Sequence, residues 1–110
     1  CLAADQVPKR GMGEYIKFFN TDAYTTTLAA SMVYKTKKPA VFICINSFEN
    51  NRLGITIKPS NEDIYNDSEY KLSVNKSIED LIKINPKDYS WEYKRFRRSP
   101  SGIDPYFKFN

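Results

Sequence analysis

The stretch AVFICINSFENNRLGITIK, residues 40–58, decides how the chain is expected to fold. Its first half (residues 40–46) is apolar on both faces of an extended strand, which is typical of a strand buried inside a parallel or mixed sheet. Its second half (residues 52–58) alternates between apolar and polar side chains. The polar residues between the halves indicate a turn, so the two halves predict an antiparallel pair. The expected inner face of the second strand carries Leu53, Ile55 and Ile57.

The segment before this stretch predicts a strand, a turn and a helix. Residues 14–19 are rich in aromatic and β-branched side chains, as strands are, and residues 20–24 indicate a turn. Residues 25–36 repeat their less polar side chains at helical spacing, and Pro39 then stops the helix. That stripe consists of Thr25, Leu28, Ala29, Met32, Val33 and Thr36. Strand, helix and strand in this order predict a βαβ unit with a right-handed crossover.

The segment after the stretch predicts a surface loop and a second helix. Residues 59–70 are polar and irregular, and residues 72–85 form an amphipathic pattern that Pro86 ends. The apolar stripe of this helix consists of Val74, Ile78, Leu81 and Ile82. We expect this stripe to face the core.

The elements together predict one α/β domain over residues 1–110, a length that suits a single modest core. The expected fold is a partial mixed sheet with a βαβ unit, a hairpin and a C-terminal helix. Residues 1–4 are apolar and indicate a short strand before a loop that contains Pro8 and Gly11. The first strand of such an open sheet is unpaired, so we expect the domain to continue N-terminally in a longer protein.

Composition and charge limit the possible functions. The chain carries a net charge of +4 and has a pI near 9.0, which favours an anionic partner. It contains no histidine, so these residues alone exclude Ser-His, Cys-His and His-metal chemistry. No apolar stretch approaches the roughly 18 residues that a membrane-spanning helix needs.

The two cysteines, Cys1 and Cys44, lack the spacing of a metal site or a disulfide framework. Cys44 lies in an apolar run, where we expect it to act as a small buried hydrophobe in a reducing compartment. Cys1 leaves open a lipid-anchored structural protein, a hypothesis that requires a signal segment in the gene.

The segment DYSWEYKRFRRSP, residues 88–100, concentrates basic and aromatic side chains. Four cations and three aromatics lie in the eight residues from Trp91 to Arg98. An anionic bilayer, a nucleic acid and an ordinary solvated surface each account for such a run. The common aromatic and basic signature of RNA-binding modules is missing from the predicted strands, which disfavours nucleic acid.

Three segments, in order, resemble the C-terminal part of the bacterial lipid A late acyltransferases, the lauroyl and myristoyl transferases. They are residues 2–27, residues 37–59 and residues 85–100. The matching positions are Asp5, Gln6, Phe18, Phe19 and Thr26 in the first segment, and Pro86, Tyr89, Trp91, Arg95, Phe96, Arg97 and Pro100 in the third. Three positions depart from the family pattern: Asn20 replaces Gly, Tyr93 replaces His and Ser99 replaces Arg.

The resemblance implies a glycerolphosphate-acyltransferase-like fold and a reaction class. Family members move an acyl chain from an acyl-carrier-protein thioester to a hydroxyl of a lipid A precursor, at the cytoplasmic face of the bacterial inner membrane. No metal or organic cofactor is implied, and no nucleic acid. The family's catalytic box, a His followed five residues later by an acid, is missing here because the chain has no histidine. We therefore expect the chain to be inactive alone.

The resemblance also implies site residues. Asp5 is expected to orient a basic group or the acceptor's head group as a supporting catalytic residue, and capping of the next turn is the competing interpretation. The other expected substrate-binding residues are Gln6, Lys9, Arg10, Thr26, Trp91, Arg95, Arg97 and Arg98. Solvated loops, helix capping and packing of the closing turn are the structural alternatives for these residues. The alternative function is a small basic α/β module that binds anionic lipid or nucleic acid.

Overall fold

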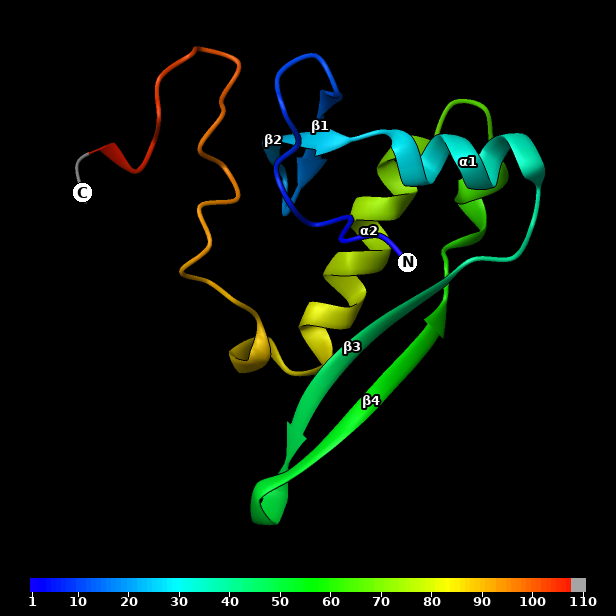
Figure 1. The fold of residues 1–110 in the computed structure, drawn as a ribbon, viewed down its shortest axis with the longest axis vertical. Coiled ribbons are helices and arrows are strands. Elements are labelled where there is room, and N and C mark those ends of the chain that lie inside the picture. Colours follow the sequence, from blue (N-terminus) through cyan, green and yellow to red (C-terminus); the bar gives the residue numbers. More distant parts are fainter. Residues whose placement is uncertain (108–110) are drawn as a thin grey trace.

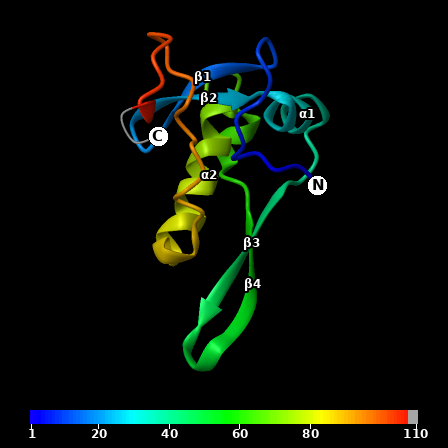
Figure 2. The same cartoon turned by 60° about the vertical axis from the view of Figure 1, so that its left-hand side comes forward.

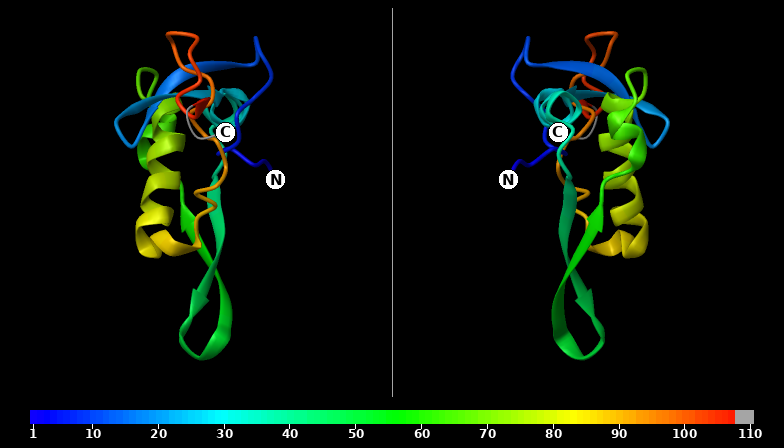
Figure 3. Two further views of the ribbon diagram at one scale, coloured as in Figure 1. Left: turned by 90° about the vertical axis from the view of Figure 1, so that its left-hand side faces the viewer. Right: turned by 90° about the vertical axis from the view of Figure 1, so that its right-hand side faces the viewer.

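The computed structural model describes residues 1–107, which form a mixed α/β arrangement of two β-hairpins and two α-helices. Helix α2 (Tyr70–Ile84) is central, and the first hairpin crosses the end of it where the helix begins (Figure 1). Helix α1 (Leu28–Thr36) lies near that same end. The second hairpin runs beside α2 and its tip extends beyond the other elements (Figures 2 and 3).

The first hairpin consists of β1 (Gly13–Phe18) and β2 (Thr21–Thr26), paired antiparallel. Phe19 and Asn20 connect the strands, and both have a positive φ, 46° and 63°. A two-residue turn of this kind matches the twist of the strands, and Asn adopts the left-handed backbone more readily than most residues.

The sequence predicted β1 with a shift of one residue but missed β2. The expected turn over residues 20–24 is wrong, because the chain reverses within Phe19 and Asn20 and then pairs again immediately. Helix α1 consequently begins at Leu28 and not at residue 25. Its end is as predicted: Lys37 adopts a left-handed φ of 55° that caps the helix.

The second hairpin consists of β3 (Val41–Phe48) and β4 (Arg52–Pro59), which confirms the predicted antiparallel pair. The predicted βαβ unit is wrong. In the described residues, β1–β2 and β3–β4 form two separate two-stranded sheets, so there is no mixed sheet and no parallel pair. After the short turn that follows β1, the chain forms β2, which pairs with β1. Neither of these strands is then available to pair with the free edge of β3.

The expected burial of the second hairpin is also wrong. One face of β3 does pack inward, through the partly buried Phe42 and the buried Asn46. The opposite face, which carries Ile43 and Ile45, is exposed, and so are Leu53, Ile55 and Ile57 of β4. α2 and the segment after it cover only one face of the hairpin, so the alternation of β4 points away from the core.

The core forms where α2 meets the first hairpin. The predicted stripe of α2 is buried as expected, and it packs with Phe18 and Ala23. Residues 59–70 are not only a surface loop, because the short 3₁₀ helix η2 (Glu62–Tyr65) inserts Ile64 into the core with 1% exposure. Residues 1–5 do not form the expected strand, although Ala4 packs against the core cluster.

Asp88, in the short 3₁₀ helix η3 (Pro86–Asp88), fastens the second hairpin to the end of α2. Its carboxylate accepts hydrogen bonds from the Ser47 hydroxyl at 2.6 Å and from the Ser47 backbone N–H at 2.9 Å. The side-chain amide of Asn85 donates to the Ser47 carbonyl at 3.0 Å. These bonds from Ser47, first the hydroxyl and then the N–H, lower the pKa of Asp88 below its usual value of 3.8.

We predict that acid releases this attachment. A depressed pKa in the folded state means that the stabilisation is present above the usual pKa and is lost as the pH falls through the lower, folded-state pKa. The Ser47 amide resonance, followed by NMR from about pH 6 to about pH 2, should shift with a midpoint below 3.8. Asp88→Asn should remove this titration. A Ser47 midpoint at or above 3.8 would contradict the assignment.

Candidate functional site

A basic cleft of about 340 Å³ lies between the first hairpin and the C-terminal segment. We call it the basic cleft; its lining is Arg10, Tyr15, Tyr24, Arg97, Arg98, Ser99 and Gly102. Three arginines therefore meet two tyrosine rings, and among residues 1–107 no acidic side chain lines the space. Guanidinium groups bind phosphate and carboxylate oxygens through paired, charge-assisted hydrogen bonds, so the cleft suits an anion.

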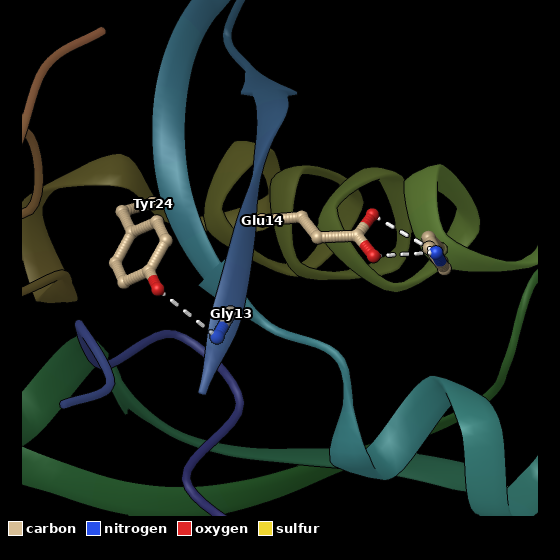
Figure 4. A network of polar contacts seen from close by, with 4 residues as sticks. Gly13, Glu14 and Tyr24 are labelled. Carbon is tan, nitrogen blue, oxygen red and sulfur yellow. Dashed lines mark hydrogen bonds and ion pairs between the residues drawn. The ribbon is translucent and has the colours of Figure 1, made fainter. Parts of the chain in front are cut away.

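Tyr24 holds one wall of the basic cleft in place. Its hydroxyl accepts a hydrogen bond from the backbone N–H of Gly11 at 2.9 Å. It accepts a second from the backbone N–H of Gly13 at 3.2 Å (Figure 4). These bonds bind the loop that carries Arg10 to strand β2. Gly13 leaves no room for a side chain there, since an added Cβ would clash with the Thr25 carbonyl oxygen. Glu14, next along β1, points the other way and pairs with Lys71 of α2 (Figure 4).

The opposite wall comes from the C-terminal segment. The Tyr15 hydroxyl donates a hydrogen bond to the Ser99 carbonyl at 2.9 Å. The Arg98 guanidinium lies 5.4 Å from the centre of the Tyr24 ring, in a cation–π contact. Tyr15 and Tyr24 are cross-strand partners, so a single hairpin face anchors both walls.

Arg95 occupies a different place from Arg97 and Arg98. It is 2% exposed and donates hydrogen bonds to the Tyr24 carbonyl at 2.8 Å and the Thr25 hydroxyl at 2.9 Å. Its guanidinium also lies 5.3 Å from the centre of the Phe18 ring. Burial lowers the pKa of Arg95 from its usual value. In this structure Arg95 therefore holds the closing segment against the hairpin and presents no surface to a ligand.

A second cavity, which we call the apolar groove, has a volume of about 550 Å³. It lies among residues 1–5, α1, β3 and α2, and aliphatic side chains dominate its lining. Its few polar groups include Asp5 and Tyr89, and the half-buried Cys44 lines it as well. Pockets of this kind, mostly apolar with a few polar groups, are the usual form of small-molecule sites.

Tyr89 links the apolar groove to the buried arginine. Burial, followed by the charge of Asp5, raises the pKa of Tyr89 to about 12, while the charge of Arg95 opposes the shift. Its hydroxyl is buried and has no hydrogen-bond partner among the described residues. The charges of Asp5 and Arg95 thus act on the same phenol in opposite directions.

The remaining predicted site residues lie outside the basic cleft. Gln6 and Lys9 are exposed on the loop before β1, and Thr26 ends β2, where its hydroxyl accepts a hydrogen bond from the Leu28 N–H. Trp91 is exposed, and its indole N–H donates to the Pro86 carbonyl at 2.6 Å. It stands 6.4 Å from the ring of the exposed Phe19, centre to centre.

Sequence reasoning found the arginines of the basic cleft but missed Tyr15 and Tyr24. The signal was present in residues 13–26. Asn20 tolerates the left-handed backbone of a two-residue hairpin turn, although Phe19 does not favour it, and a turn at these two residues places Tyr15 opposite Tyr24. Taking residues 20–24 as a turn concealed that register.

The fold and its cavities define a small mixed α/β protein with a basic cleft and an apolar groove. The sequence matches the bacterial lipid A biosynthesis acyltransferase family over residues 1–98, and the chain belongs to that family. A search of curated proteins gave no match. Within residues 1–107, neither α-helix has the length and apolar character needed to cross a membrane.

Proposed function

We propose that the chain supplies the acceptor-binding part of a lipid A late acyltransferase with a glycerolphosphate-acyltransferase-like fold. In the reaction, an acceptor hydroxyl attacks the thioester carbon of an acyl carrier protein. The carbon–sulfur bond breaks, an ester bond forms, the hydroxyl proton passes to a general base, and the carrier leaves as a thiol. The acceptor is a phosphorylated glycolipid, the lipid A precursor.

The basic cleft is the observation that carries the proposal. Arg10 comes from the loop before β1, whereas Arg97 and Arg98 come from the C-terminal segment, and the fold brings them together with no acid between them. An anionic sugar phosphate fits this chemistry in two ways. Arginine forks bind the phosphate oxygens, and the exposed ring of Tyr15 offers a flat surface to the sugar.

The group that accepts the hydroxyl proton in the proposed reaction is not among the residues of this chain. The general base of the proposed reaction is a histidine, and the chain has none. We therefore propose that residues 1–110 act as the C-terminal part of one acyltransferase domain. Asp5, which lines the apolar groove, orients the head group of the acceptor as a supporting residue. The purified chain should transfer no acyl group from acyl carrier protein, and detectable transfer would contradict this assignment.

The proposed location is the cytoplasmic face of the bacterial inner membrane. The exposed rings of Trp91 and Phe19 stand side by side on the surface. Aromatic side chains near lysines and arginines suit the interface of an anionic bilayer, where rings sit at head-group level and cations meet phosphates.

Vesicle binding tests the acceptor site. We expect the chain to bind phosphatidylcholine vesicles that contain a phosphorylated lipid A precursor more tightly than vesicles with the same lipid after phosphate removal. Arg97→Ala with Arg98→Ala should weaken binding by about tenfold or more, because each lost charge-assisted hydrogen bond contributes about 1.5 kcal/mol or more.

Arg52→Ala is the matched control, since Arg52 is an exposed arginine at the tip of the second hairpin, far from the basic cleft. It should change affinity by less than about twofold. An equal loss of vesicle affinity in Arg52→Ala would mean that net charge alone, and not the basic cleft, accounts for binding. Tighter binding to a single-stranded RNA oligonucleotide than to the phosphorylated vesicles would favour a nucleic-acid module instead.

A further inference from the structure

One wall of the basic cleft includes a turn that lies beyond the family match. Residues 99–102 form this turn, which we call the terminal turn, and its first and last residues, Ser99 and Gly102, line the cleft. The family match ends at residue 98, so all three arginines of the cleft lie within the matched part and the terminal turn lies outside it. Loops on a rigid scaffold commonly carry the features that distinguish one ligand from another.

The sequence of the terminal turn, Ser-Pro-Ser-Gly, preforms it. Serine at the first position, proline at the second and glycine at the fourth are the favoured residues of a tight turn. The Gly102 N–H donates to the Ser99 carbonyl at 3.0 Å, and Gly102 adopts a φ of 77° that glycine tolerates without strain. The Ser99 hydroxyl donates to the Ile103 carbonyl at 2.6 Å, which fixes the chain after the turn.

Tyr15 ties the terminal turn to the first hairpin. The Ser99 carbonyl, which already accepts the Gly102 N–H, accepts a second hydrogen bond from the Tyr15 hydroxyl at 2.9 Å. The Tyr15 ring lies against the Tyr24 ring, with 5.2 Å between the ring centres, so strand pairing sets the position of this hydroxyl. The wall therefore has a fixed position relative to the hairpin before any ligand binds.

We infer that the terminal turn, held by Tyr15, makes the basic cleft selective for anionic esters with a single substituent, an inference that rests on the proposed function. A monoester presents three oxygens to the guanidinium groups of Arg10, Arg97 and Arg98, and its one substituent points out of the cleft. A diester carries a second substituent, which must displace either an arginine or the terminal turn. Tyr15 is a positioning residue, because it acts through the turn.

Two soluble probes separate the shape of the anion from its charge. One is a glucose monosulfate ester, with one substituent on sulfur, and the other is the methyl diester of the corresponding glucose phosphate, with two substituents on phosphorus. Both carry a single negative charge at neutral pH. In an NMR titration of the full chain, followed at the Gly102 amide, the wild-type chain should bind the sulfate ester about tenfold more tightly or better.

Tyr15→Phe keeps the ring and removes only the hydroxyl. It should raise the affinity for the diester about fivefold, the factor that corresponds to the net contribution of one neutral hydrogen bond, because the terminal turn can then move aside. The affinity for the sulfate ester should stay within about twofold, since the arginines are unchanged. General damage to the fold would weaken binding of both probes, so a gain for the diester alone reports the wall.

Tyr65→Phe is the matched control. The Tyr65 hydroxyl also donates to a backbone carbonyl, that of Lys38 at 3.1 Å, and the residue is 38% exposed, against 44% for Tyr15, but it lies outside the basic cleft. It should leave the ratio of the two affinities unchanged, and the same change of ratio as in Tyr15→Phe would overturn the inference.

The outcomes distinguish this inference from the proposed function. Equal wild-type affinity for both probes, or an unchanged ratio in Tyr15→Phe, overturns the role of the terminal turn. If Arg97→Ala with Arg98→Ala still abolishes binding in that case, the proposed acceptor site stands without it. If the wild-type chain binds neither probe and the double arginine variant leaves vesicle binding unchanged, the proposed function and this inference both fail.

Discussion

Arg95→Ala should lower the free energy of unfolding by about 3–5 kcal/mol. The change leaves the Tyr24 carbonyl and the Thr25 hydroxyl without their buried donor. It also leaves a cavity beside the Phe18 ring, since Arg95 is 2% exposed. Urea denaturation of both chains, analysed by linear extrapolation, measures the difference.

Arg97→Ala is the control for this prediction, because Arg97 is an exposed neighbour with the same side chain. Its effect on unfolding should stay within about 0.5 kcal/mol. The two variants separate a residue that holds the fold from a residue available to a ligand. If Arg95→Ala were as stable as the wild-type chain and Arg97→Ala were not, the assigned roles would be reversed.

Phe18→Ala should lower the free energy of unfolding by a similar amount, about 3–5 kcal/mol. Phe18 is 1% exposed and its ring lies 6.0 Å from the Phe96 ring and 6.5 Å from the Tyr89 ring, centre to centre. Removing the ring leaves a void that joins the first hairpin, α2 and the closing segment, so these elements lose a shared contact. Urea denaturation followed by tryptophan fluorescence gives the change.

Phe19→Ala is the matched control, since the same ring at the next position is 36% exposed. We expect a loss of about 1 kcal/mol or less, because the Phe19 backbone keeps its role in the turn and its N–H keeps the bond to Glu79. Equal effects at the two positions would mean that Phe18 is not the centre of the core.

The sequence predicts those parts of the fold whose signals are local. The stripe of α2 repeats at helical spacing from Val74 to Ile82, and Pro86 marks the end of the helix, so the helix and its buried face could be inferred directly. The pairing of β3 with β4 follows from two strand-like runs joined by a short polar turn. The strand β2 was missed because its threonines also suit a helix start, and local propensity does not decide between them.

Burial of the second hairpin could not be inferred from residue type. An apolar run such as residues 40–46 shows that a strand can be buried, whereas the number of layers that cover it depends on the other elements of the fold. Here α2 packs against one face of β3, and Ile43, Ile45, Ile55 and Ile57 stay exposed.

Only part of the basic cleft could be predicted from the sequence. The family resemblance implied Arg10, Arg97 and Arg98 as separate substrate-binding residues, and the fold brings these three side chains to one cleft. Sequence alone did not separate Arg95 from the two arginines that follow it, because neighbouring positions of an irregular segment have no fixed period. The direction of each side chain there depends on contacts with distant residues, such as the one between Arg95 and Thr25.

The single hydroxyl of Tyr24 accepts two backbone N–H groups, while its ring supports Arg98. One rigid aromatic residue therefore sets the distance between two segments that are more than seventy residues apart in the chain. Because Tyr24 already holds this wall of the basic cleft in place, ligand binding would cost the wall little conformational entropy. We therefore expect the proposed acceptor site to discriminate among phosphate esters by their shape.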